Sequence, residues 1–232
     1  MVFIIAEIGV NWDGDFDLLR SMVDRAKNAG CNAVKFQAYK KDLIEKHPEC
    51  SRLVKSAISK ENINVIDDIC NEIGIEWFCT PMYKEIVDVL DPFVMRYKIR
   101  EFDGRKLLEN KKTELFEKVL NTGKEIIISS NKSPKSCEFY GKSNIKWLYC
   151  VPKYPCKLEE IDFSELIDFN GYSNHYPHFI APLMASILGS EIIEIHITAD
   201  KSKNFIDNNV SFDFNELDQL VRYIQICEKI KH

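Results

Sequence analysis

The segment IIEIHITAD, residues 192–200, alternates isoleucine with polar side chains along its length. This alternation is typical of a β-strand, in which successive side chains point to opposite faces. Isoleucines would occupy one face, and the opposite face would carry Glu194, His196 and Thr198. Such a face inside a domain is costly unless each polar group has a partner. The segment therefore predicts a strand whose polar face meets a metal ion, a substrate or a polar network, with a solvent-facing edge strand as the alternative.

The amino-acid composition is that of a globular protein and argues against several other classes. The 232 residues are 45% hydrophobic and 29% charged, which is ordinary for a folded domain. A net charge of −5 gives no support for generic binding to nucleic acid or to an anionic membrane. No apolar run approaches membrane-spanning length. The apolar start MVFIIAEIG lacks the basic residues and cleavage site of a signal peptide, so it predicts a first strand.

Eight cysteines are scattered along the chain without a CxxC pair. A chain of this length does not need disulfides to stabilise its core. We expect reduced, mostly buried thiols in a cytoplasmic protein, and no zinc site built from cysteine.

Strand patterns like the one at residues 192–200 recur along the chain and alternate with helical patterns. The strands are expected at residues 3–8, 33–37, 75–80, 95–99, 125–130, 145–151, 169–173 and 192–200. The helices are expected at residues 15–28, 63–72, 84–90, 107–120, 177–188 and 214–230, with short helical turns near 134–140 and 162–166. A longer loop is expected around Pro48.

This alternation predicts parallel strands joined by crossover helices. Eight such units in 232 residues fit an α/β fold of the (β/α)8 TIM-barrel type, with residues 1–232 as a single domain. An open doubly wound sheet is the alternative. Neither GxGxxG nor GxxxxGKS/T occurs in the sequence to support it.

Polar residues gather at the predicted carboxyl ends of the strands. They are Glu7, Lys35, Gln37, Thr80, Lys98, Ser129, Ser130, Ser173, His175, Glu194 and His196. In a barrel these ends meet at one mouth, which is the usual place for an active site. The sequence therefore predicts that these side chains form one polar site.

His175 and His196 follow neighbouring strands, so their imidazoles can reach one metal ion. Glu7 lies on the first strand, which would close the barrel beside the last. Two imidazoles with a carboxylate or water suit Mn²⁺, Fe²⁺ or Zn²⁺. The alternative is that each histidine is a buried structural residue that only forms hydrogen bonds.

Lys35 and Lys98 each lie inside an apolar strand, where a buried ammonium group needs an anion. The hydroxyl groups that could complete a phosphate or carboxylate pocket belong to Thr80, Ser129 and Ser173. The alternative is a set of structural ion pairs with Glu7, Glu194 or Asp103. A further set could form hydrogen bonds to a polyol: Gln37, Asp103, Tyr154 and Asp207.

Several short motifs occur in a fixed order: IAEIGVNWDGD, VKFQAYK, EWFCTP, YKI, CVPKYP, GYSNH and EIHIT. Together they resemble the sialic acid synthase family, whose members make N-acetylneuraminic acid and related nonulosonic acids from phosphoenolpyruvate. The family's usual forms are AEIGxNHxGD, VKFQ, STP, YKIxS, SxYP, GYSDH and EKHFT. The resemblance spans essentially the whole chain.

The resemblance implies a TIM barrel that condenses phosphoenolpyruvate with an open-chain N-acetylated hexose, giving a nonulosonic acid and phosphate. It also implies a divalent metal, typically Mn²⁺ with Mg²⁺ or Co²⁺ as alternatives, that polarises the sugar aldehyde. A homodimer is a further expectation.

Carried over by position, the resemblance makes His175 and His196 the metal ligands and places the Glu7 carboxylate near the metal. Phosphoenolpyruvate would be held by Lys35, Thr80, Lys98, Ser129 and Ser173. The sugar would face Gln37, Asp103, Tyr154, Glu194 and Asp207. The expected catalytic residues are Glu7, Lys35 and Lys98.

Some positions depart from the family pattern, namely Trp12, Asn174, Ile195, Glu101 and Pro152. Glu101 and Pro152 replace a serine and an asparagine that contact phosphoenolpyruvate in the family. A carboxylate beside a phosphate is repulsive unless it is neutralised, here by Arg100 or Arg105. The family's C-terminal antifreeze-like domain is also expected to be absent.

Two other functions remain open. One is a metal-dependent barrel aldolase or isomerase that acts on a related sugar or keto acid without phosphoenolpyruvate. The other is a non-catalytic relative that binds a sugar. The presence of Glu7, two histidines and two lysines at the motif positions favours an enzyme.

Overall fold

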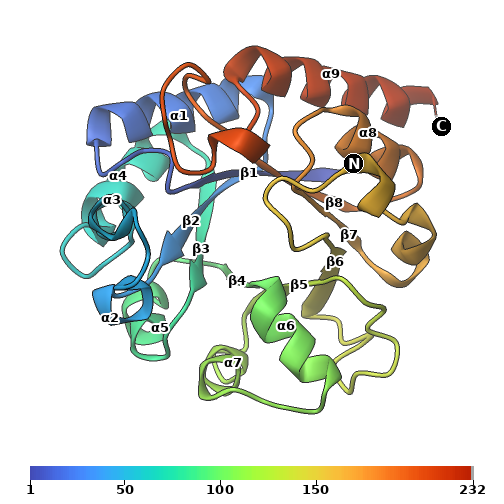
Figure 1. The fold of residues 1–232 in the computed structure, drawn as a ribbon, viewed down its shortest axis with the longest axis horizontal. Helices are drawn as coiled ribbons and strands as arrows, with labels where there is room; N and C mark the ends of the chain where they lie inside the picture. The colour runs from blue at the N-terminus through green and yellow to red at the C-terminus, as the bar shows by residue number, and fades with distance from the viewer. Residues whose placement is uncertain (231–232) are drawn as a thin grey trace.

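The computed structural model describes residues 1–230, whose parallel strands close into one barrel surrounded by helices (Figure 1). Neighbouring strands pair in chain order, and the last strand pairs with the first. Within the described residues the strands are β1 (Phe3–Gly9), β2 (Ala33–Ala38), β3 (Glu76–Pro81), β4 (Arg96–Ile99), β5 (Glu125–Ser130), β6 (Ile145–Tyr149), β7 (Gly171–Asn174) and β8 (Ile192–His196). The predicted TIM barrel is confirmed, and the open doubly wound sheet is wrong.

Helices cover the outside of the barrel, and α9 packs against both α1 and α8 along one side of it (Figure 1). The α-helices are α1 (Phe16–Ala29), α2 (Lys41–Ile44), α3 (Cys50–Ser56), α4 (Ile63–Ile73), α5 (Glu85–Leu90), α6 (Glu101–Leu108), α7 (Glu114–Leu120), α8 (Ile180–Ile187) and α9 (Phe214–Ile230). Three 3₁₀ helices in the described residues are η1 (Leu158–Glu160), η2 (Phe163–Asp168) and η3 (Asn208–Val210).

Strand β8 shows how the alternating sequence produces both the core and the site. Ile193 and Ile195 are fully buried in the apolar core between barrel and helices. Glu194 and His196 are also buried, but they line a cavity inside the barrel mouth. Strand pairing sets Glu7 of β1 opposite His196 on one side and opposite a lysine of β2 on the other. The solvent-facing interpretation of this strand is therefore wrong.

The predicted helix at residues 107–120 is also wrong, because α6 and α7 divide this region between them. Helix α6 ends at Leu108, and Asn110 takes a left-handed backbone conformation with a φ of 57°. Thr113 then caps α7, since its hydroxyl oxygen accepts a hydrogen bond from the Phe116 backbone N–H at 3.1 Å. The linking residues contain no glycine or proline, so the pattern of the sequence did not reveal the break.

Short elements account for the other differences. Helices α2 and α3 lie in the segment predicted as a loop around Pro48. Residues 134–140, all of them described, form turns rather than a helix, and the turn expected at 162–166 overlaps η2. Helices this short depend on tertiary packing more than on their own sequence.

The described chain has no helix that combines the length and the apolar character needed to cross a bilayer. All eight cysteines are unpaired, and most are buried, as the sequence predicts. Burial raises the pKa of the Cys150 thiol to about 12, so this cavity-lining group is not a ready nucleophile.

Gly104 allows α6 to lie directly against β5. A Cβ atom at this position would meet the backbone oxygen of Ser129 at 2.2 Å and Cγ2 of Ile128 at 2.8 Å.

We expect Gly104→Ala to lower the free energy of unfolding, measured in urea, by about 3 kcal/mol, which is the upper end of the usual cost of overpacking. The control is Gly123→Ala, because Gly123 has a positive φ of 72° but open space around it. Gly123→Ala should lower the free energy of unfolding by about 1 kcal/mol. An equal decrease in the two variants would contradict the close approach of α6 to β5.

Candidate active site

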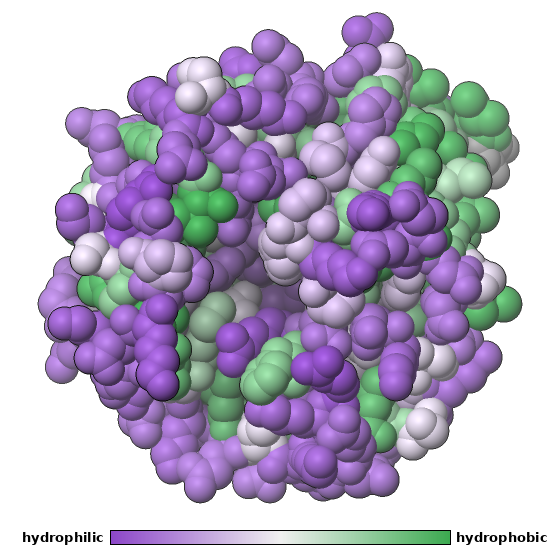
Figure 2. Space-filling model, in the orientation of Figure 1, coloured by the Kyte–Doolittle hydropathy of each residue, from purple (hydrophilic) through white to green (hydrophobic). Residues whose placement is uncertain are grey.

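A cavity of about 460 Å³ opens at the carboxyl ends of the strands. Figure 2 shows the hollow near the centre of the view, with hydrophilic residues deep inside it. The predicted site residues that line it are Glu7, Lys35, Gln37, Thr80, Lys98, Ser129, Tyr154, Ser173, His175, Glu194, His196 and Asp207. The barrel mouth therefore brings together side chains from seven strands and from the loop that follows β6, as the (β/α)8 topology predicts.

A chain of alternating charges crosses the floor of the cavity. The Lys35 ammonium lies 2.8 Å from Oε2 of Glu7 and 3.8 Å from Oε1 of Glu194. Lys98 donates to both oxygens of Glu194, at 2.8 and 3.0 Å. All four side chains are at least 95% buried. The ion pairs predicted with Glu7 and Glu194 are therefore present, and they satisfy both buried lysines.

The protonation of these groups follows from burial and charge together. Burial acts to lower the pKa of Lys35, but Glu194 and Glu7 reverse the effect and raise it. Burial prevails at Lys98, whose pKa is lowered. Burial acts to raise the pKa of Glu194, but Lys35 and Lys98 together hold it below the ordinary value. Glu194 therefore stays ionised between two ammonium groups.

The two histidines lie beside each other at the wall of the cavity. Their ring centroids are 5.6 Å apart, and the Tyr154 ring packs over His175 at 4.0 Å. The Nδ1 atom of His175 is 2.6 Å from the Val151 carbonyl oxygen, which assigns the proton to Nδ1 and leaves the lone pair on Nε2. Burial, with a contribution from His196, lowers the pKa of His175 to about 3, so its ring is neutral at pH 7.

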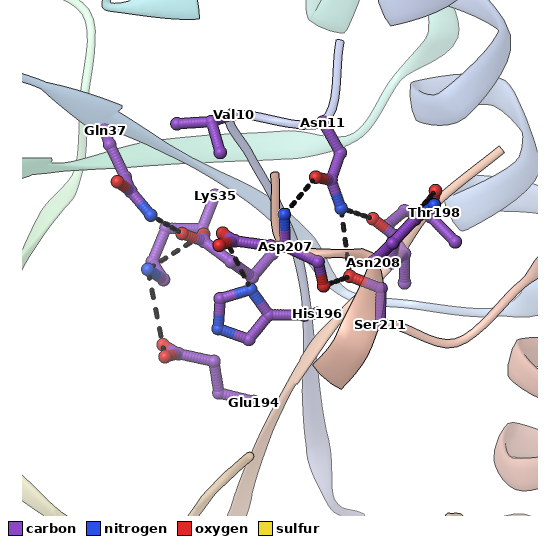
Figure 3. A network of polar contacts seen from close by, with 12 residues as sticks. Val10, Asn11, Lys35, Gln37, Glu194, His196, Thr198, Asp207, Asn208 and Ser211 are labelled. Carbon is purple, nitrogen blue, oxygen red and sulfur yellow. Dashed lines mark hydrogen bonds and ion pairs between the residues drawn. The ribbon is translucent and has the colours of Figure 1, made fainter. Parts of the chain in front are cut away.

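Asp207 orients the second histidine from the loop between β8 and α9. Its Oδ2 lies 3.4 Å from Nδ1 of His196 (Figure 3). Burial acts to raise the pKa of Asp207, but the His196 contact lowers it overall. A carboxylate at Nδ1 favours a proton on that nitrogen, which directs the Nε2 lone pair away from Asp207.

Asn11 holds this loop in place, although its role was not predicted from the sequence (Figure 3). Its amide Nδ2 donates to the Ile197 carbonyl and to the Ser211 hydroxyl, each at 2.9 Å. Its Oδ1 accepts the backbone N–H of Asp207 at 3.0 Å. A fully buried amide with three partners fixes the backbone of Asp207 relative to β1. The sequence signal that could have identified Asn11 is its place in the motif that follows the first strand.

The donor set fits a divalent cation. Imidazole nitrogens and carboxylate oxygens are ligands that Mn²⁺, Fe²⁺ or Zn²⁺ accept. Within residues 1–230, no group of three or more His, Cys, Asp or Glu side chains is placed to share one ion. An ion held by His175 and His196 alone would take its other ligands from substrate and water, the arrangement that catalytic metal sites use for their open positions.

Comparison with known proteins identifies the family. A model of the NeuB family matches residues 22–232. The chain belongs to the NeuB family. An uncharacterized protein of Methanocaldococcus jannaschii is 34% identical over 246 residues, covering 98% of this chain and 71% of the relative. The N,N'-diacetyllegionaminic acid synthase of Legionella pneumophila is 28% identical over 261 residues, covering 98% of this chain and 72% of that enzyme.

A solved structure of a NeuB-like enzyme has the same barrel. It is the crystal structure of N-acetylneuraminic acid (sialic acid) synthetase from Leptospira borgpetersenii in complex with citrate, with a TM-score of 0.86 and 30% identity. The match covers 99% of this chain and 85% of that chain. The resemblance to sialic acid synthases is confirmed, and the names of the relatives place the NeuB family in carbohydrate biosynthesis.

Most departures from the NeuB motifs lie away from the cavity. Trp12 is fully buried and donates its indole N–H to the Ser56 carbonyl. Asn174 donates to the Tyr176 carbonyl, and Ile195 packs in the core. Glu101 and Pro152 are different, because both line the cavity and can affect what it binds.

Two predicted site residues do not line the cavity of the NeuB barrel. Ser130 instead donates its hydroxyl to the Lys132 carbonyl at 2.9 Å, and Asp103 lies on α6. Its carboxylate lies 2.9 Å from Nε of Arg100 and 3.2 Å from Nζ of Lys106, along one face of α6. Its ion pairing is therefore with these neighbours rather than with Lys35 or Lys98, and the geometry gives no support to a sugar contact.

We expect Asn11→Ala to loosen the loop that carries Asp207. The change leaves the Asp207 N–H and the Ser211 hydroxyl with fewer partners, so the free energy of unfolding should fall by about 2 kcal/mol. Hydrogen exchange at residues 199–210 should rise more than elsewhere. Asn71→Ala on the exposed face of α4 is the control. Unchanged exchange in this loop would show that Asn11 does not hold it.

Proposed function

We propose that this NeuB-family chain condenses phosphoenolpyruvate with an open-chain N-acetylated hexose, giving a nonulosonic acid and phosphate. The observation that carries the proposal is a single cavity in which two imidazoles face a buried lysine–glutamate chain. The first set suits a divalent ion and the second suits an anionic donor. The relatives named as synthases of sugar acids support the same reaction class.

His175 and His196 hold the divalent ion in this proposal, with Mn²⁺ as the first candidate and Mg²⁺ or Co²⁺ as alternatives. The bound ion supplies Lewis-acid polarisation of the sugar aldehyde. The Val151 carbonyl and the Asp207 carboxylate keep each ring in one tautomer, so that the Nε2 lone pairs are available. Glu7, opposite His196 in the strand register, accepts the proton of the water that adds during condensation.

Lys35 and Lys98 bind phosphoenolpyruvate in this proposal. Each ammonium already lies against a carboxylate, so it is held in place and can donate its remaining hydrogens to phosphate or carboxylate oxygens. Lys35 also donates to the Thr80 hydroxyl at 3.2 Å, and the buried Ser129 hydroxyl has no hydrogen-bond partner in the protein. Ser173 donates to Glu194 at 2.9 Å and completes this side of the pocket.

Gln37, Tyr154, Glu194 and Asp207 face the sugar in this proposal. Gln37 is oriented by its 2.7 Å hydrogen bond to Glu7, which leaves its carbonyl oxygen to accept a sugar hydroxyl. The exposed Tyr154 ring forms the outer wall of the cavity over His175.

A second candidate is a metal-dependent aldolase or isomerase that uses a related sugar or keto acid without phosphoenolpyruvate. Glu101 and Pro152 favour it, because they add a negative charge and remove a hydrogen-bond donor at the cavity.

The test is phosphate release from phosphoenolpyruvate across a panel of N-acetylated hexoses, with Mn²⁺, Mg²⁺ or Co²⁺. Release should require both sugar and metal and should be lost in Lys98→Met. A nonulosonic acid should appear by mass spectrometry. No release with any hexose, together with carbon–carbon bond formation from pyruvate, would favour the second candidate.

A further inference from the structure

Glu101 is a buried carboxylate with no hydrogen bond at the end of the cavity formed by β4, β5 and α6. It begins α6, is 9% exposed and lines the cavity. Its Oε1 is buried without a hydrogen-bond partner, and the nearest cation is Arg105, whose Nε is 3.8 Å away. The Ser129 hydroxyl, on the strand against which α6 packs, is also buried and without a partner. Two unpartnered polar groups at one end of a cavity point to a ligand there.

The other carboxylates of the cavity each have a hydrogen-bond donor or a side chain at ion-pair distance closer than the one beside Glu101. Glu7 accepts from Gln37 and lies against Lys35. Glu194 accepts from Lys98 and from a serine hydroxyl. Asp207 faces His196. Glu101 is therefore the carboxylate of the cavity lining whose ionised form is least stabilised.

The charges of the lining make an incoming dianion costly. Four carboxylates line the cavity, and the lysines are both bound to carboxylates. Arg100 also lines it, but its guanidinium is bound to Asp103 at 2.9 Å. Even with a divalent cation at the histidines, a phosphate group near Glu101 would meet a negative charge that Arg105, with its Nε 3.8 Å away, offsets only in part.

We propose that Glu101 takes up one proton from solvent when a phosphate-type oxyanion binds, and that its carboxylic O–H then donates a hydrogen bond to the anion. This inference rests on the proposed use of a phosphate-bearing donor and makes Glu101 a specificity-determining residue for it. No covalent bond to the ligand forms or breaks in this step. The complex holds the anion plus one proton on a Glu101 oxygen.

The surroundings of Glu101 favour its protonated form more than water would. Burial raises its pKa, and only the Arg105 charge opposes this. The other titratable group that faces it in the described structure is the Cys150 thiol after β6, which is neutral because its pKa is about 12. At the contact with α6, strand β5 contributes Ile128 and Ser129, neither of which is charged. A bound dianion would raise the pKa of Glu101 further, because like charges disfavour ionisation.

Sulfate is a suitable probe because it stays a dianion across the pH range of interest. Its dissociation constant is measured by calorimetry from pH 5 to 8.5, in pairs of buffers with different ionisation enthalpies. The full chain, Glu101→Gln and Glu101→Ser are compared. The matched control is Glu109→Gln, an exposed carboxylate at the other end of α6. Circular dichroism confirms that each variant folds.

For the native chain, sulfate affinity should be constant below the Glu101 pKa of the free protein, which lies above 4.5. Above that pKa, the affinity for sulfate should fall by up to about tenfold per pH unit, and each binding event should take up close to one proton. Glu101→Gln should lose this uptake and bind sulfate at least about tenfold more tightly than the native chain at pH 8.5, while Glu109→Gln behaves like the native chain. Equal proton uptake in the native chain and both Glu101 variants would overturn the inference.

Phosphoenolpyruvate is then titrated in the same series. Glu101-linked proton uptake with sulfate, but no turnover of phosphoenolpyruvate with any hexose, would support the inference while defeating the proposed function. Turnover that is indifferent to Glu101→Gln at every pH, with no Glu101-linked uptake, would defeat the inference and leave the proposed function standing.

Discussion

Mn²⁺ binding should be lost when either His175 or His196 is replaced by alanine. The proposed ion has only these two protein ligands, so either substitution removes half of them. We expect affinity to fall by more than about 100-fold, beyond the losses typical of residues that only orient a ligand. Condensation should fall to background in both variants. Calorimetry with Mn²⁺, and electron paramagnetic resonance of the free ion, measure the binding directly.

The control is His178→Ala. His178 lies just after β7 like His175, but it is exposed, stacks on Phe179 and does not line the cavity. Its replacement should leave Mn²⁺ affinity unchanged. Each variant should keep the far-ultraviolet circular dichroism of the native barrel, because the imidazoles lie at the mouth and not in the apolar core. Mn²⁺ binding that survives both His175→Ala and His196→Ala would refute the assigned ligands.

The barrel could be predicted because its pattern is local and repeated. Each strand is a short apolar run followed by polar residues, and each long helix shows its own spacing of apolar residues. The carboxyl ends of parallel strands meet at one mouth, so the position of His196 or Lys98 at a strand end was enough to predict that they share a cavity.

The break between α6 and α7 could not be predicted in the same way. It depends on Asn110 in a left-handed conformation and on the Thr113 cap, and neither residue type marks a break by itself. The role of Asp103 was missed because its side-chain direction depends on where α6 begins. Starting at Glu101, the helix sets Asp103 beside Lys106 rather than into the cavity.

The polar contacts of the site needed the folded chain for a different reason. Asn11 is paired with residues 186 and more positions away, and no local pattern encodes such a partner. Similarly, the sequence indicated that Lys98 needs an anion, but it could not choose among Glu7, Glu194 and Asp103. The closed barrel determines the partner, because it arranges the strands around one axis and so places Glu194 beside Lys98.

Lys98→Met should produce the largest loss of stability in the barrel. The change removes the donor that holds both oxygens of Glu194 and leaves this buried carboxylate with Ser173 and a more distant Lys35. Breaking a buried pair on one side costs about 3–5 kcal/mol, because the remaining charge is uncompensated. Urea unfolding measures the loss. Phosphoenolpyruvate turnover should be lost as well, since Lys98 is a proposed donor to its phosphate or carboxylate.

The double variant Lys98→Met/Glu194→Gln separates the pair from the packing of its side chains. With both charges removed, the free energy of unfolding should recover by at least about 2 kcal/mol relative to Lys98→Met, while turnover stays absent. If the double variant is as unstable as the sum of the two single changes, Lys98 and Glu194 are not coupled through their charges.

Acid should act on the same pair. The pKa of Glu194 is lower in the folded chain than its ordinary value of 4.5, because Lys35 and Lys98 outweigh burial. A lowered carboxyl pKa contributes stability that is complete above the unfolded value and is lost as the pH falls from about 4.5 through the folded pKa. Unfolding curves measured from pH 6 down to pH 2.5 should therefore show a steeper loss for the native chain than for the double variant Lys98→Met/Glu194→Gln. Parallel pH profiles would show that the charge chain across the cavity floor does not contribute to the pH dependence of folding.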